Sequence, residues 1–220
     1  PMHIRQYMDL RGQVAKVRAN REKALFSHIF NKAREWGFTT AQNPCQGVKG
    51  FKETGRSRYV TDEEFDRVRA NAHCTVVDAM DIALLTGQRP ADVLKIKRTD
   101  IRDGALWIVQ NKTGARLGIE ITGELSAVIE RINQRPRKAI SAFLIQDENG
   151  QPLSQGALRS RFDKARTLAK VDFQFRDIRA KAATDTGDLG HSQKLLGHKN
   201  REMTEHYVKS RKGERVKPSR

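Results

Sequence analysis

The sequence predicts an α+β fold, a mainly helical protein with one small antiparallel sheet. Residues 21–36 place apolar side chains at helical spacing, and several later segments follow a residue that commonly caps a helix. Only residues 105–121 have the composition of two short strands, around a turn at Asn111–Gly114. With 220 residues, 37% of them apolar, the chain is long enough for one large domain and a smaller piece.

The first predicted element is the helix over residues 21–36, in which Leu25, Ile29 and Ala33 recur at helical spacing. Asn20 is a suitable cap for its start, and Gly37 can end it. The next residues, NPCQGVKGFKETGRSR, contain proline, glycine and many basic residues without periodicity. This composition is typical of a connection between a small helical piece and a main domain.

The main domain begins with a capping box, because Thr61 and Glu64 stand three residues apart before an apolar run. A more apolar helix follows and ends near Gly87. Beyond the two strands, a helix starts at Thr122 and is stopped by Pro136. We expect the remaining helices to begin at about residues 154, 175, 192 and 201.

The formal net charge of +16 is concentrated near the two ends of the chain. Residues 1–60 carry 12 Lys and Arg against 4 Asp and Glu, and residues 199–220 carry 8 against 3. Residues 61–198 carry 22 against 19. Basic ends of this kind are typical of proteins that bind nucleic-acid phosphates, although a solvated basic surface has the same composition.

Signals for a membrane or for secretion are missing from the sequence. No run of about 18 apolar residues is present, and the N-terminal residues lack the apolar part of a signal peptide. Cys45 and Cys74 are isolated, so we expect no disulfide framework and a reducing environment. The chain starts at Pro1 rather than methionine, and we expect a fragment or a processed protein.

Four segments place cations or hydrogen-bond donors where a helix or turn should begin or end. They are TGQRPADVLKI (86–96), QNKTGARLGI (110–119), FRDIRAKAATDTG (175–187) and KLLGHKNREMTEHY (194–207). Taken singly, their candidate residues have ordinary explanations, such as interaction with a helix dipole, solvation, capping or core packing. The candidates are Arg89, Asp92, Lys112, Arg176, Arg179, His198 and Tyr207.

The order of these residues resembles the tyrosine recombinase, or phage integrase, family. The pattern is T-G-x-R-x-x-D, a lysine in a β-turn, x-D-x-R at a helix start, and L-L-G-H with a tyrosine nine residues later. It covers about residues 58–210, while residues 20–53 resemble the end of the family's core-DNA-binding domain. The resemblance implies the family's catalytic-domain fold. It also implies a site-specific DNA recombinase or integrase that cleaves and rejoins strands through a covalent 3′-phosphotyrosine.

The resemblance also implies a role for each candidate. Tyr207 falls on the nucleophile, Lys112 on the acid for the leaving 5′ oxygen, and Asp92 on a supporting acid. Arg89, Arg179 and His198 fall on the positions that surround the scissile phosphate. Arg176 stands where the family usually has histidine, and an arginine cannot accept a proton. We expect Arg176 to donate to the same phosphate as Arg179, since the two lie one helical turn apart.

These residue types suit attack on a phosphodiester. Guanidinium groups match the geometry of phosphate oxygens, and cations lower the pKa of a tyrosine phenol from its usual value of about 10. A phenol that attacks phosphorus keeps the bond energy for religation. We expect no cofactor and no metal, because the arginines neutralise charge and the sequence lacks C-x-x-C and H-E-x-x-H.

Three other functions stay open on the sequence alone. One is a DNA-binding module of the same fold without strand-transfer activity. A metal-dependent nuclease is disfavoured by the missing ligand motifs. An acyl enzyme of the penicillin-binding type is suggested by Lys112-Thr113-Gly114, but the S-x-x-K motif of that family is absent.

We therefore expect a partial core-DNA-binding domain at residues 1–53, a linker at 54–60, a catalytic domain at 61–210 and a basic tail at 211–220. The resemblance implies double-stranded DNA with specific recombination sites as substrate. It implies a homotetramer on two paired sites, with DNA-bending proteins as accessory partners and no membrane. The expected location is the cytoplasm of a bacterial cell, at the nucleoid, with the gene on a prophage or mobile element.

Overall fold

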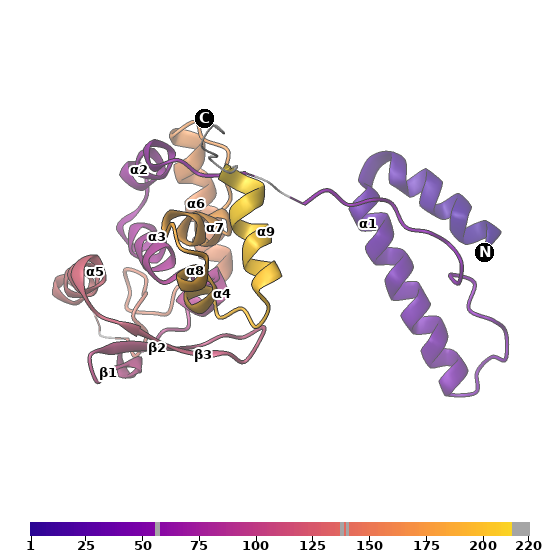
Figure 1. Ribbon diagram of the computed structural model, residues 1–220, viewed down its shortest axis with the longest axis horizontal. Helices are drawn as coiled ribbons and strands as arrows, with labels where there is room; N and C mark the ends of the chain where they lie inside the picture. The colour runs from indigo at the N-terminus through magenta and orange to yellow at the C-terminus, as the bar shows by residue number, and fades with distance from the viewer. Residues whose placement is uncertain (56–57, 137–138, 140, 213–220) are drawn as a thin grey trace, which may run out of the picture. The chain divides into compact units, whose positions relative to one another are not determined.

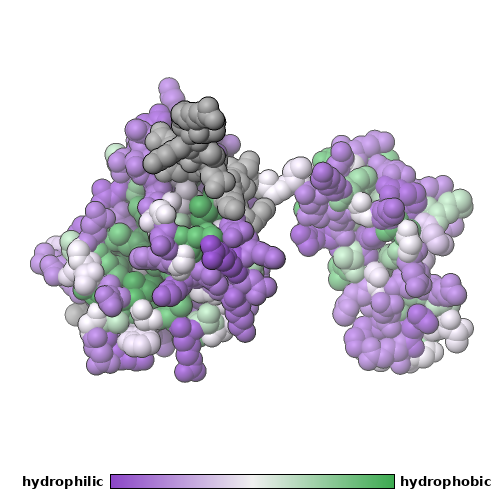
Figure 2. Space-filling model, in the orientation of Figure 1, coloured by the Kyte–Doolittle hydropathy of each residue, from purple (hydrophilic) through white to green (hydrophobic). Residues whose placement is uncertain are grey.

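The computed structural model describes residues 1–55, 58–136, 139 and 141–212, with no side-chain placement for 206 and 209–212. The chain divides into two compact units, Pro1–Arg56 and Ser57–Arg220. Hydrophilic residues cover most of the visible surface of each unit (Figure 2). In the part of the chain that is described, no helix is both long and apolar enough to cross a membrane.

The first unit is built on one kinked helix, α1 (Met2–Glu35). Ala15 has a non-helical backbone (φ −152°, ψ 75°), which divides α1 into the two arms seen in Figure 1. The prediction that a helix starts after Asn20 is wrong, because α1 already runs through this residue. The Asn20 side chain instead donates to the backbone O of Phe51 (2.9 Å) and accepts from its N (2.8 Å).

The segment after α1 has no helix or strand but packs along the second arm of α1. The Asn43 amide donates to the backbone O of Ser27 (3.1 Å), and the Lys23 ammonium donates to the O of Val48 (2.6 Å). A small apolar core is formed by Met8, Ala19 and Val48, with Ile4 and Phe51 beside it. The proline and glycine in this segment therefore mark irregular backbone that is held by side-chain hydrogen bonds.

The second unit confirms the predicted fold class, with a helical body and one small sheet at its end (Figure 1). Its helices are α2 (Asp62–Ala70), α3 (Cys74–Thr86), α4 (Pro90–Val93), α5 (Gly123–Gln134), α6 (Gln155–Leu168), α7 (Asp177–Asp185), α8 (Leu189–Leu196) and α9 (Arg201–Lys212), with a 3₁₀ turn at Arg98–Asp100. The sheet contains β1 (Ile101–Arg102), β2 (Ala105–Val109) and β3 (Arg116–Glu120) in the antiparallel order β1-β2-β3. The predicted hairpin is thus β2–β3. Strand β1 was not predicted, because two residues are too few to show an alternation of apolar and polar side chains.

Sequence signals at the helix ends agree with the structure. The predicted capping box is formed, because Thr61 and Glu64 bond to each other's backbone N–H groups at the start of α2. Gly87 ends α3 and Gly197 ends α8, both in the left-handed conformation that favours glycine (φ 64° and 63°). The helix predicted from residue 192 begins earlier, at Leu189, because Asp188 caps it.

Helix α7 lies at the centre of the second unit and packs against α3, α8 and α9. All of its residues from Asp177 to Thr184 are buried. A charged network also ties α5 to α3, since Arg131 pairs with Asp78 (3.0 Å) and Asp81 (2.8 Å). The buried helix at the centre of the unit, α7, is also the helix that carries the x-D-x-R motif.

Candidate active site

Arg179 is the most buried of the predicted cations, with 3% of its surface exposed. Its Nη1 donates to the backbone O of Gly87 (2.6 Å), and its Nη2 donates to the O of Leu196 (2.7 Å). These two carbonyls stand at the C-terminal ends of α3 and α8, where carbonyls lack helical partners and carry partial negative charge. Two helix ends therefore fix the Arg179 guanidinium, while its buried Nε has no hydrogen-bond partner among the residues that the structure describes.

His198 lies beside Arg179 because the left-handed Gly197 turns the chain out of α8. The His198 Nε2 is 3.2 Å from the Arg179 Nη2, and the His198 Nδ1 is 3.0 Å from the Thr204 Oγ1. A side chain at Gly197 would also crowd the Gln110 amide at 3.1 Å. Burial lowers the pKa of His198 to about 4, and the nearby charges of Arg179 and Arg89 act in the same direction.

Tyr207 is half-buried on α9 and faces the same group of side chains. Its ring centroid lies 5.5 Å from that of His198. Burial lowers the pKa of Arg179 to about 10, helped by the Arg89 charge and opposed by charge interaction and hydrogen bonding with the Tyr207 phenol. The Tyr207 phenol and the Arg179 guanidinium therefore interact.

Arg89 precedes α4 and lies at the opening of this group, with 24% of its side chain exposed. Its Nη1 donates to the Gln110 Oε1 (3.2 Å) and is 3.8 Å from the Asp92 Oδ2. The buried Asp92 also accepts from the backbone N of Asn111 through its Oδ1 (2.9 Å). Asp92 thus connects Arg89 to the turn between β2 and β3.

Gln110 is a buried residue in contact with the site that the sequence reasoning missed. It is 1% exposed, and its Nε2 donates to the Gln88 Oε1 (2.8 Å) and to the backbone O of Leu196 (2.9 Å). Its Oε1 accepts from Arg89 and from the Thr113 hydroxyl. The alternation of β2, which buries residues 106 and 108, continues to residue 110, and this signal could have identified it.

Two predicted residues lie outside this hydrogen-bonded group. Lys112 is exposed in the turn between β2 and β3. Arg176 is exposed at the N-cap of α7 and lines a groove of about 680 Å³ together with Pro90, Arg159 and Arg166. The one-turn spacing of Arg176 and Arg179 therefore does not give them equal burial. Within the described residues, side-chain interactions join Arg89, Asp92, Arg179, His198 and Tyr207.

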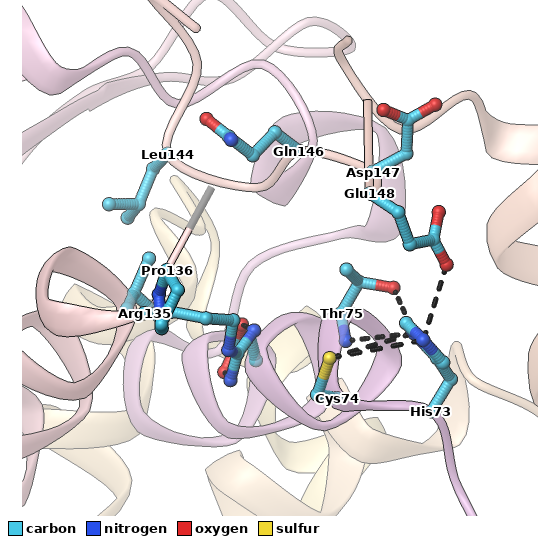
Figure 3. Close-up of a pocket in the computed structure, with 11 residues that line it drawn as sticks. His73, Cys74, Thr75, Arg135, Pro136, Leu144, Gln146, Asp147 and Glu148 are labelled. Atoms are coloured by element: carbon cyan, nitrogen blue, oxygen red, sulfur yellow. Dashed lines mark hydrogen bonds and ion pairs between the residues drawn. The ribbon is translucent and has the colours of Figure 1, made fainter. Parts of the chain in front are cut away.

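Another hollow, of about 420 Å³, lies between the start of α3 and the end of α5 (Figure 3). It contains Cys74 beside His73, whose Nε2 is 3.2 Å from the Glu148 Oε1. None of its lining residues belongs to the four sequence motifs. No group of three His, Cys, Asp or Glu side chains that could hold a metal occurs among the residues with described positions.

The chemistry available to the arginine group is that of an anion site with a nucleophile. Arg89 and Arg179 offer guanidinium N–H donors, which suit the oxygens of a phosphodiester. The Tyr207 phenol interacts with Arg179, and burial lowers the pKa of His198. Attack by the phenol on phosphorus is therefore the reaction that these groups fit best.

Known proteins are similar to this chain in sequence and in fold. The prophage integrase IntE of Escherichia coli (strain K12) is 29% identical over 207 residues, which cover 84% of this chain and 55% of IntE. A crystal structure of a lambda integrase(75-356) dimer bound to a COC′ core site has a TM-score of 0.83, with 24% identity and coverage of 99% of this chain and 81% of that one. A lambda integrase tetramer bound to a Holliday junction gives the same TM-score and identity, with coverage of 98% and 65%.

The chain spans about half the length of the curated relatives it matches. The likeness to the two lambda integrase structures shows the fold of this chain. The model of the phage integrase family matches residues 61–214, which includes every candidate residue of the site. By this match, the chain belongs to the phage integrase family.

Proposed function

We propose that this chain is a tyrosine-type site-specific DNA recombinase, which cleaves and rejoins DNA through a covalent 3′-phosphotyrosine. The observation that supports this most directly is the placement of the Tyr207 phenol beside the buried Arg179 guanidinium and the His198 ring. A protein that only bound DNA would not need a phenol there. A site whose positive charge comes from arginine side chains also favours this reaction over that of a metal-dependent nuclease.

In this proposal, Arg89 and Arg179 bind the non-bridging oxygens of the scissile phosphate. Two helix ends and Gln110 hold the guanidinium groups in place before DNA binds. The site therefore needs little free energy to reorganise during the reaction. Lys112, exposed on its turn, protonates the leaving 5′ oxygen. Arg176 supplies a further donor to the phosphate backbone from the rim of the site.

The partners proposed for the whole protein follow from its relatives. Lambda integrase has been crystallised as a dimer on a core site and as a tetramer on a Holliday junction. We propose the same assembly here, a homotetramer on two paired recombination sites. DNA-bending accessory proteins, a bacterial cytoplasm and a prophage or mobile-element origin belong to the same proposal, and residues 1–53 would contribute to binding of the core site.

The test is the formation of a covalent adduct on nicked DNA in the presence of EDTA. Duplexes that bind the chain are first selected from a random-sequence library and then nicked next to the candidate scissile phosphate. Wild-type protein should form an adduct that resists denaturation, and Tyr207→Phe should form none while binding DNA about as well. The chain has three tyrosines, so Tyr7→Phe and Tyr59→Phe serve as matched controls that keep the adduct.

Two results would count against the proposal. An adduct formed normally by Tyr207→Phe would exclude Tyr207 as the nucleophile. If wild-type protein binds the selected duplex and never forms an adduct, the chain is a DNA-binding module of the same fold.

A further inference from the structure

The hydrogen bonds around His198 define its tautomer. The Arg179 guanidinium can only donate, so the His198 Nε2 at 3.2 Å must be the acceptor and carry no proton. The neutral ring then carries its proton on Nδ1, which donates to the Thr204 Oγ1 at 3.0 Å. A ring in this state has a lone pair, and no N–H, on the side that faces Arg179.

Thr204 is placed to impose this state. It is fully buried (0% exposed) and lies on α9, three residues before Tyr207. Residues at this spacing share one face of a helix, so the hydroxyl and the phenol approach His198 from the same element. The ring contact between His198 and Tyr207, at 5.5 Å between centroids, agrees with this arrangement.

The groups that surround the ring keep it neutral. Arg179 comes from α7, Arg89 precedes α4, and Tyr207 comes from α9, while Asp92 is the acid on α4 that partners Arg89. Burial and the two arginine charges lower the pKa of His198 to about 4, so the imidazole is uncharged at neutral pH. A neutral ring with a bare Nε2 accepts a proton from a neighbour and cannot donate one from that atom.

We propose that Thr204 is a positioning residue that holds His198 as the Nδ1–H tautomer, and that the His198 Nε2 accepts the phenolic proton of Tyr207 during strand cleavage. This inference rests on the proposed recombinase function. It gives the phenolic proton a destination at the side chain whose ring lies against that of Tyr207, whereas Arg176 cannot act as a base.

The step is balanced as follows. A bond forms between the Tyr207 Oη and phosphorus, and the bond from phosphorus to the 5′ oxygen breaks. The phenolic proton moves to the His198 Nε2, and the leaving oxygen takes a proton from Lys112. When phosphate enters, Arg179 donates to its oxygens in place of Nε2, and the phosphate's negative charge offsets the effect of the arginines on the ring. Religation runs the same transfers in reverse.

The tautomer can be measured without DNA. In ¹⁵N-edited NMR of the whole chain, wild-type His198 should show a protonated Nδ1 and an unprotonated Nε2 at pH 7. Thr204→Val, which keeps the shape and removes the acceptor, should show a mixture of tautomers, and Thr204→Ser should restore the wild-type pattern. Thr184→Val is the matched control, because in the described part of the chain the buried Thr184 hydroxyl bonds only to a carbonyl of its own helix, that of Ala180 (2.8 Å).

Single-turnover cleavage of the selected nicked duplex tests the proton transfer. Thr204→Val should cleave about tenfold more slowly, roughly the loss of one hydrogen bond, and Thr204→Ser should recover most of the rate. His198→Gln keeps an N–H donor near the Nε2 position but no base, and it should lose on the order of 10²-fold or more. The wild-type rate should fall as pH drops through the pKa of His198, and His198→Gln should lack this acid limb.

Several results would overturn the inference. One is a protonated Nε2 in the wild-type NMR spectrum, and another is wild-type cleavage by Thr204→Val with an unchanged pH profile. His198→Gln with nearly wild-type rate would show that His198 works as a donor to phosphate. In each of these cases the Tyr207 adduct still forms, so the recombinase function stands. Loss of the adduct in wild-type protein removes that function itself, whatever the NMR result.

Discussion

Lys112 differs from the other candidate residues because it is exposed on a turn, whereas Arg179 and His198 are buried. An exposed ammonium on a hairpin can reach a leaving group that enters with DNA, which suits a general acid. Lys112→Ala should therefore cleave ordinary DNA on the order of 10²-fold more slowly than wild type. Substituting sulfur for the leaving 5′ oxygen should restore the rate, since a thiolate leaves without a proton. An equal defect on both substrates, in single-turnover assays, would remove Lys112 from the acid role.

His198 should also make the stability of the second unit depend on pH. Its pKa is about 4 when folded, below the value of about 6.5 expected for an unfolded chain. Between these values the unfolded chain binds more protons, so stability should decline as pH falls below about 6.5 and level off near pH 4. The full difference corresponds to about 3 kcal/mol. Urea unfolding at pH 7 and pH 5, followed by Trp107 fluorescence in a Trp36→Phe background, should show a smaller decline in His198→Gln than in the parent protein. Identical declines would contradict this prediction.

The β2–β3 hairpin is joined to the arginine group mainly by Gln110. Gln110→Ala removes the oxygen that accepts from Arg89 and the amide that donates to the Gln88 Oε1 and the Leu196 O. These two oxygens stay buried and lose that donor. We expect a loss of roughly 2–3 kcal/mol in unfolding free energy and cleavage about tenfold slower, with DNA affinity nearly unchanged. Gln134→Ala, at the exposed end of α5, is the matched control. Cleavage and unfolding of Gln110→Ala that match this control would exclude the linking role.

Elements were predictable where a local rule decides them. The capping box at Thr61, the stop at Gly87 and the hairpin depend on neighbours in sequence, and these predictions are confirmed. Asn20 was misassigned because its partners, the backbone atoms of Phe51, lie 31 residues away. The difference in burial between Arg176 and Arg179 also depends on packing. Their spacing of three residues does not show which side of α7 is covered by α3, α8 and α9.

At the scale of the whole molecule, the order of residues in the sequence allowed the candidate site to be proposed. It did not identify the residues that hold the site side chains in place. Arg89, Asp92, Arg179, His198 and Tyr207 were named from motifs, and their contacts are present in the structure. Thr204 was not named, because a polar residue reveals such a role only when its tertiary partners are known. Gln110 was not named either, although the alternation of β2 extends to it. The roles of all these residues in catalysis remain predictions.

The charge distribution of the chain leads to a prediction about binding. Residues 1–60 and 199–220 together hold 20 of the 42 basic residues but only 7 of the 26 acidic ones. If these residues neutralise DNA phosphates, the affinity for the selected duplex should fall steeply with salt. In a plot of the logarithm of the association constant against the logarithm of salt concentration, we expect a slope steeper than about −3. The association constants are measured by fluorescence anisotropy. A shallower slope would indicate that the basic residues mostly face solvent.

The hydrogen bonds from Arg179 to two helix ends determine when, during folding, the anion site is complete. The Gly87 carbonyl is 92 residues from Arg179 in sequence, and Gln110 reaches the Leu196 carbonyl across 86 residues. Contacts of such separation close large loops and form late in folding. A nascent or partly folded chain therefore carries the tyrosine but not the assembled anion site around it. Under the proposed function, we therefore expect strand breakage only from molecules whose second unit is complete.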